Sequence, residues 1–89
     1  MQRIQLEAAK IVGRVVYDGR NLTQVMSETL RKQSHLTAQE RGALQDLCYG
    51  TLRFYGRLAF MLDSLLERPV RELRLRYLLL VALYQLQHT

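Results

Sequence analysis

The run from residue 73 to 86 constrains the fold more than any other part of the chain. It contains eight consecutive apolar residues, from Tyr77 to Tyr84, with arginines before this core and glutamines after it. An apolar run of this length is too short to span a bilayer, which takes about 20 residues as a helix. Leucine outnumbers β-branched residues, which favours helix over strand. Because a helix that is apolar on nearly all faces has to be surrounded by other helices, residues 73–86 are predicted to form the central helix of an all-α bundle.

Four more helices are predicted from the apolar stripes in the rest of the chain. We expect them at about 3–18, 22–33 and 38–54 and in the segment that ends before Pro69, while the apolar run itself continues over about 71–87. The chain is therefore expected to form a single all-α bundle of about five helices over residues 1–89. Spacings of three and four residues place the following side chains on the inward faces: Ile4, Ala8, Ile11, Val12, Val15, Leu22, Val25, Met26, Leu30, Leu44, Leu47, Cys48, Leu52, Leu58, Met61, Leu62, Leu65 and Leu66.

Local signals mark where two of these helices begin. Asn21 is a suitable N-cap for the second helix, because its short side chain can accept a hydrogen bond from a free backbone N–H. Thr37 and Glu40 have the spacing of a capping box, in which each side chain bonds to the backbone of the other residue. Gly56 weakens helix formation and is expected to mark a bend after the third helix.

The charge of the chain leaves its class of partner open. The net charge is +5, and all but two of the 13 basic residues are arginine. The arginine guanidinium offers a planar fork of donors to phosphate and stacks on bases, which favours a nucleic-acid partner. A GC-rich genome would also encode many arginines, so composition alone does not separate these interpretations.

Little in the sequence indicates catalysis or metal binding. His35 is expected in a loop and His88 at the end of the chain, and neither has a carboxylate or cysteine at ligand spacing. Cys48 lies on a predicted inward face, which favours a buried structural thiol over a nucleophile. A single cysteine excludes an intrachain disulfide, and with no signal-peptide pattern at the start we expect cytoplasmic residence. No glycine-rich phosphate loop is present.

One helical surface combines cations with an aromatic ring. Arg41, Gln45, Tyr49, Arg53 and Arg57 follow one another at a constant spacing of four. Cations contact phosphates and an aromatic ring stacks on unpaired bases, so this stripe is a candidate RNA-binding surface. In the competing interpretation Tyr49 is half-buried and the arginines are ordinary solvated charges.

Several segments resemble the NusB-like domain. They are ERGALQDLCYGTLR at 40–53, Arg-Pro at 68–69 and VALYQL at 81–86, in this order, together with Ala8-Ala9 and Asn21-Leu22. The sequence is most similar to the version of this domain at the N-terminus of the RsmB (Sun/Fmu) class of bacterial 16S ribosomal RNA cytosine-C5 methyltransferases. The resemblance covers essentially the whole chain.

The resemblance implies an all-helical RNA-binding module with 16S ribosomal RNA as its partner. It also implies that S-adenosylmethionine binds in a catalytic domain absent from this chain, so that the chain needs no cofactor and is not an enzyme by itself. The family normally continues past the point where this chain ends, at His88-Thr89, so we expect a fragment of a larger protein.

Two further basic groups are weaker candidates. Arg3, Lys10 and Arg14 form a stripe where NusB relatives place basic residues, although Glu7 lies within it and is expected to pair with Lys10. The compact arginine cluster that opens NusB is missing. The second group surrounds the start of the apolar run and consists of Arg68, Arg71, Arg74 and Arg76.

Two other functions remain open. A helix as apolar as 73–86 is expected to leave one face uncovered when only four helices surround it, and exposed apolar patches mark interaction sites. The chain would then be a protein-interaction module that self-associates through this helix or docks against its own C-terminal methyltransferase domain. A free-standing NusB-type transcription antitermination factor is the remaining alternative.

Overall fold

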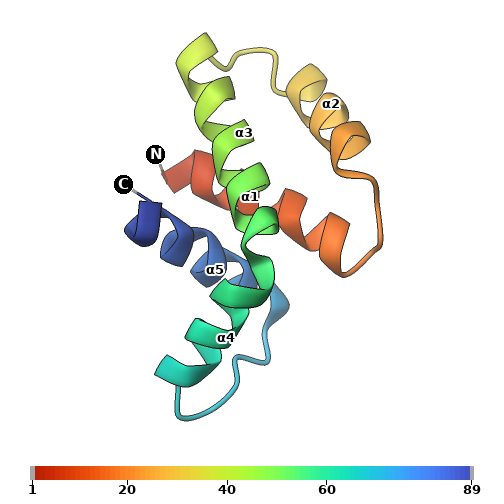
Figure 1. Ribbon diagram of the computed structural model, residues 1–89. Helices are drawn as coiled ribbons and strands as arrows, with labels where there is room; N and C mark the ends of the chain where they lie inside the picture. The colour runs from red at the N-terminus through yellow and green to blue at the C-terminus, as the bar shows by residue number, and fades with distance from the viewer. Residues whose placement is uncertain (1, 89) are drawn as a thin grey trace.

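A computed structural model describes residues 2–88 as five α-helices, without a strand in that range. They are α1 (Gln2–Val16), α2 (Leu22–Lys32), α3 (Ala38–Arg53), α4 (Tyr55–Leu65) and α5 (Leu73–His88). The predicted all-α bundle of five helices is confirmed. Figure 1 shows α3 crossing in front of α1, with α4 continuing from its lower end.

Both predicted helix starts are present. The Asn21 side chain accepts a hydrogen bond from the Gln24 N–H at 3.0 Å and caps α2. At the start of α3, Thr37 Oγ1 accepts from the Glu40 N–H at 3.1 Å, and Glu40 Oε1 accepts from the Thr37 N–H at 2.9 Å. This reciprocal pair satisfies two donors that the first turn of a helix leaves free. The residue at which α3 begins is therefore determined by its own local sequence.

The break after α3 lies at Phe54 and not at Gly56, which is inside α4. Phe54 leaves helical geometry with φ −104° and ψ 21°, and its ring stacks on the rings of Tyr84 and His88 in α5. A tertiary contact, rather than a weak helix former, therefore accompanies the bend. α4 also ends at Leu65, earlier than Pro69 requires, and the chain reaches α5 through a segment that lacks regular structure.

The centre of the bundle is shared by two helices. α1 packs against α2, α3 and α5, and α5 packs against α1, α3 and α4. The prediction of a single central helix at 73–86 is therefore only half right, because α1 also packs against three other helices. The buried apolar side chains are Ile4, Ala8, Ala9, Ile11, Val12, Val25, Met26, Leu36, Leu44, Leu47, Cys48, Leu58, Leu62, Tyr77, Leu80, Val81 and Tyr84.

Some side chains predicted to face inward are not buried. Leu65 is 69% exposed, because α4 packs mainly against α5 and α3 and its far end extends beyond them (Figure 1). The following are half-buried at the margin of the core: Val15, Leu22, Leu30, Leu52, Met61 and Leu66.

One face of α5 is uncovered, as expected for a helix with so few neighbours. We call it the outer face of α5; it consists of Leu75, Leu79, Ala82 and Leu86. Leu75 and Leu86 are exposed, Leu86 at 78%, and the other two are half-buried. The buried residues of α5 lie on the opposite side of the helix. α5 therefore has a buried face and an outer face, and both consist of apolar residues.

An ion pair ties α4 to α5. The Arg76 guanidinium donates to both carboxylate oxygens of Asp63, at 2.8 and 3.3 Å. These bonds hold the pKa of Asp63 below its usual value, and the Thr37 N–H does the same for the pKa of Glu40. Both carboxylates are accessible to solvent, so the interaction of each contributes only modestly to the free energy of unfolding.

We expect the free energy of unfolding to fall in acid because of these two carboxylates. Their pKa values are lower in the folded chain than in the unfolded chain, so the unfolded chain takes up protons first. Their stabilisation is complete above the ordinary values of 3.8 and 4.5 and disappears as the pH falls through the lowered folded values. Urea unfolding from neutral pH down to about pH 3 measures this loss. Asp63→Asn should lose less stability over the same range, and an identical acid dependence would contradict the assignment.

Candidate nucleic-acid interface

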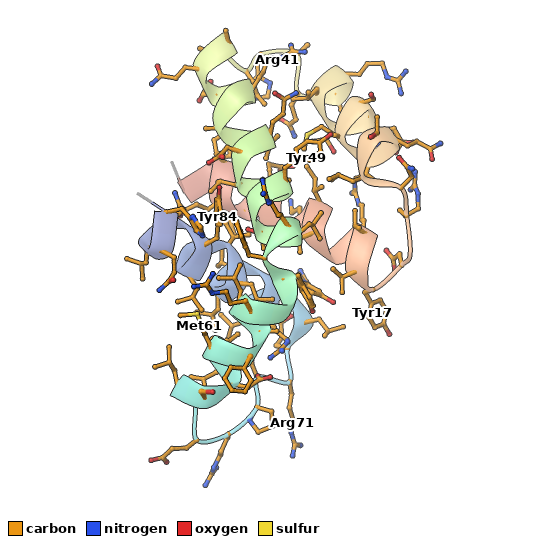
Figure 2. All side chains as sticks on the ribbon, viewed as in Figure 1. Tyr17, Arg41, Tyr49, Met61, Arg71 and Tyr84 are labelled. Carbon is orange, nitrogen blue, oxygen red and sulfur yellow. The ribbon has the colours of Figure 1, made fainter. Side chains whose placement is uncertain are left out.

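The stripe predicted on the third helix is solvent-exposed over the length of α3. Arg41, Gln45, Tyr49 and Arg53 are all exposed, and we call them the α3 surface. Figure 2 shows Arg41 near the start of the helix and Tyr49 midway along it. Arg41 and Arg53 are twelve residues apart, which corresponds to about 18 Å along the helix. Tyr49 is 48% exposed, so part of its ring is open for stacking.

Aromatic rings lie at the lower end of the α3 surface. The Arg53 guanidinium lies 5.4 Å from the centroid of the Phe54 ring, within cation–π distance. His88 stacks on Phe54 with centroids 4.8 Å apart and on Tyr84 at 4.7 Å. Sequence reasoning missed this cluster because its members come from the end of α3 and from α5, which are far apart in the chain. Of these rings His88 is exposed, Phe54 is half-buried and Tyr84 is buried, so the cluster adds the His88 ring and part of the Phe54 ring to the cations of the α3 surface.

Arg57 does not continue the stripe. It is exposed but lies in α4, beyond the break at Phe54. The spacing of four implies a shared face only while the helix is continuous, and Phe54 ends α3. The predicted surface of five residues is therefore four residues on α3 with Arg57 beside them on another helix.

The stripe predicted on the first helix borders a groove. Arg3, Lys10 and Arg14 are exposed on α1, and the expected pair of Lys10 with Glu7 is present at 3.6 Å. Lys10 and Arg14 line a groove of about 290 Å³ between α1 and the start of α5, which we call the α1–α5 groove. Its other lining residues are Leu6, Ala9, Gly13, Tyr17, Asp18, Leu73, Arg74 and Tyr77.

The α1–α5 groove leaves almost no trace in the sequence, because its two sides come from opposite ends of the chain. Gly13 is the one residue whose type reflects it. A Cβ atom at this position would lie 3.1 Å from Cδ2 of the Tyr77 ring, so the glycine lets α5 approach α1 closely. A helical glycine on a charged face is the signal that could have indicated the contact.

The arginines around the start of α5 have separate roles. The guanidinium of Arg76 is engaged by Asp63, so it holds two helices together rather than facing a ligand. Arg74 lies 3.8 Å from Glu72 in an exposed pair and lines the α1–α5 groove. Arg68 and Arg71 are exposed in the segment before α5. These four residues therefore do not form one surface.

The groups that could perform chemistry are few. Cys48 is fully buried with its sulfur 4.0 Å from the Ala8 carbonyl, and burial raises the pKa of its thiol to about 12. The thiol therefore stays protonated, which confirms the structural interpretation of Cys48. His35 is exposed in the loop before α3. Over residues 2–88, no three histidine, cysteine or acidic side chains come together as a metal site.

No helix in the described part of the chain is long and apolar enough to cross a membrane.

Comparison with known proteins identifies a family and a set of longer relatives. The NusB family matches residues 2–89. The chain is 34% identical over 84 residues to ribosomal RNA small subunit methyltransferase B of Proteus mirabilis (strain HI4320), a match that covers 92% of this chain and 19% of the relative. The proteins of the same name from Yersinia pseudotuberculosis serotype O:1b (strain IP 31758) and Yersinia pestis bv. Antiqua (strain Angola) are 36% identical over the same shares. No solved structure matches the chain.

Proposed function

This chain belongs to the NusB family, and on that basis we propose that it is the RNA-binding module of a ribosomal RNA (cytosine-C5) methyltransferase. In this role it would hold 16S ribosomal RNA through phosphate contacts, so that a catalytic domain reaches its cytosine. The chain spans about a fifth of the length of the relatives it matches, so catalysis would belong to the rest of such a protein.

The exposed α3 surface is the observation that carries this proposal. It presents two arginines and a half-open tyrosine ring along one helix, and Arg53 continues into the stacked rings of Phe54 and His88. Guanidinium groups bind phosphates and flat rings stack on unpaired bases. The relatives are named as methyltransferases of ribosomal RNA, and these names also support RNA as the ligand.

The residues of this chain do not fit an S-adenosylmethionine site. Its glycines lie in helices or, for Gly19, in the turn after α1, and residues 2–88 contain no strand from which a glycine-rich loop could open onto a helix. We therefore assign no step of methyl transfer to this chain. The cofactor would bind in the catalytic domain.

Replacing both Arg53 and Arg57 with alanine is expected to weaken RNA binding several-fold. Both side chains are exposed, so the change removes two positive charges near the α3 surface without disturbing the core. A fluorescence titration against a short ribosomal RNA hairpin at two salt concentrations measures the effect, and each lost phosphate contact should reduce the salt dependence by about one unit of slope.

The matched control is Arg31→Ala with Lys32→Ala, which removes the same charge from the exposed end of α2. This variant should bind nearly as well as the unchanged chain. Equal losses in the two double variants would mean that net charge alone drives binding. Unchanged affinity without Arg53 and Arg57 would exclude this surface, and no binding at low salt would refute the proposed function.

The outer face of α5 favours a second candidate, a protein-interaction module. We expect the chain to self-associate through Leu75, Leu79 and Leu86, since burying them removes apolar surface from water. Sedimentation equilibrium should show dimers at high concentration, and Leu86→Glu, which changes a side chain that is 78% exposed, should restore the monomer. A chain that stays monomeric at every concentration would contradict self-association and leave this face to another domain.

A further inference from the structure

The α1–α5 groove combines an apolar floor with a cationic rim. Ala9 and Tyr77 are buried at its base, and Leu6 and Leu73 add partly exposed apolar surface. Three cations, Lys10, Arg14 and Arg74, line it together with one acid, Asp18, while Glu7 and Glu72 lie outside the lining. The groove therefore suits a ligand that is both flat or apolar and negatively charged.

The cations on this rim are available to a ligand. Arg14 forms no ion pair with any residue from 2 to 88. Lys10 and Arg74 are paired with Glu7 and Glu72, but at 3.6 and 3.8 Å and with well exposed basic groups. Exposed pairs of this kind stabilise a protein by at most about 1 kcal/mol, so a phosphate can replace the carboxylates at little cost.

An aromatic ring stands at the mouth of the groove. Tyr17 follows the last turn of α1 and is 70% exposed, and Figure 2 shows it projecting from that end of the helix. An exposed tyrosine next to an unpaired arginine is the arrangement that stacks on a base and binds the adjoining phosphate.

The volume of the groove limits the size of the anionic ligand that it can hold. About 290 Å³ accommodates one small planar group. An amphipathic helix from a partner would need a longer groove, because it binds through side chains spread over two turns. An unpaired nucleotide meets all three conditions of size, flatness and charge.

We propose that the α1–α5 groove binds one unpaired nucleotide of an RNA, with its base against Tyr17 and the apolar floor and its phosphates on Arg14 and Lys10. Arg74 binds the phosphate on the other side of the groove. This subsite rests on the proposed RNA-binding function but is separate from the α3 surface, so the two surfaces contact different parts of one RNA.

Photo-crosslinking tests the location directly. The probe is a short single-stranded oligoribonucleotide that carries one photoreactive thiouridine, irradiated with the full chain and then digested with trypsin. Cleavage after the arginines puts Tyr17 alone in peptide 15–20 and Tyr49 in peptide 42–53. We expect the crosslink in peptide 15–20; peptide 77–89 contains Tyr77 from the floor of the groove but also Tyr84 and His88 beside the α3 surface, so a crosslink there does not count as support. Crosslinks confined to peptide 42–53 would overturn the proposal.

Affinities of three variants for the same oligonucleotide complete the test. Tyr17→Ala should weaken binding by at least about 5-fold, as expected for the loss of one stacked base, whereas Tyr17→Phe should retain it. Phe60→Ala is the control, since this ring is 75% exposed on α4 and belongs neither to the α3 surface nor to the lining of the α1–α5 groove.

The outcomes separate this subsite from the proposed function. Failure of the unchanged chain to bind the oligonucleotide at low salt would refute both. Binding that Tyr17→Ala leaves intact, with crosslinks only in peptide 42–53, would refute the subsite alone and leave the groove to a protein segment. A loss in Tyr17→Ala equal to that in Phe60→Ala would likewise refute a specific stack.

Discussion

Replacing Gly50 with alanine is expected to destabilise the fold by about 2–4 kcal/mol, from overpacking together with a lost hydrogen bond. Gly50 is buried in α3, and a Cβ atom there would overlap Cζ and Oη of the Tyr84 ring in α5. The ring has little freedom to move away. It is buried, its hydroxyl donates to Asp46 at 3.0 Å, and His88 stacks on it.

Thermal unfolding followed by circular dichroism measures this effect. A loss of about 2–4 kcal/mol should lower the midpoint by roughly 10–20 °C in a domain of this size. Gly42→Ala is the matched control in the same helix, because nothing lies within 4 Å of the added methyl group. It should raise stability by about 0.5–1 kcal/mol through better helix propensity. A Gly50→Ala variant as stable as Gly42→Ala would show that α3 and α5 are not in contact here.

Leu80→Ala is expected to destabilise the chain by about 2–5 kcal/mol, the usual loss for a fully buried leucine. Leu80 is completely buried in α5, where the helix meets its neighbours in the core. Truncation removes its packing contacts and leaves a cavity, because the surrounding helices relax only partly. For a chain with a total stability of about 5–10 kcal/mol, this loss is a large fraction.

Leu86→Ala is the control for Leu80→Ala, because it makes the same change on the exposed face of α5. The same change on the outer face of the same helix should alter stability by less than about 0.5 kcal/mol, because Leu86 is already in water. Urea unfolding at low protein concentration gives both values. Similar losses at the two positions would mean that a second copy or an alternative packing covers the outer face.

The arrangement of the bundle keeps recognition and stability on separate residues. The α3 surface and the rim of the α1–α5 groove consist of exposed side chains, while the contacts that hold the helices together are mostly apolar, with the ion pair of Arg76 and Asp63 and the hydrogen bond from Tyr84 to Asp46 beside them. The proposed RNA contacts can therefore be removed one by one without unfolding the chain. The variants described above depend on this separation.

Local chemistry in the sequence was enough to predict the five helices and several of their ends. The capping box of Thr37 and Glu40, the cap at Asn21 and the pair of Glu7 with Lys10 all act within four residues, so the pattern alone predicts them. Apolar spacing of three and four then identified most of the core. The resemblance of the sequence to the NusB-like domain supplied the family, which the family match confirms.

Tertiary structure decided which candidate residues share a surface. Arg57 was predicted on one stripe with Arg53, but the stacking of Phe54 against α5 accompanies a break between them. Lys10 and Arg14 were predicted on a stripe of their own, and the approach of α5 adds Arg74 and an apolar floor. Helical spacing describes only neighbours along one helix, so contacts between distant segments lie outside its reach.

The face that α5 turns outward was also decided only in three dimensions. The run from Tyr77 to Tyr84 contains no charged residue to mark a solvent side, so its sequence predicts a helix without a preferred orientation. Packing against α1, α3 and α4 buries Leu80 and leaves Leu86 in water. The chain by itself thus determined that this segment is a helix, because propensity and periodicity are local. Its orientation depends on which neighbours cover it, because burial is a property of the whole bundle.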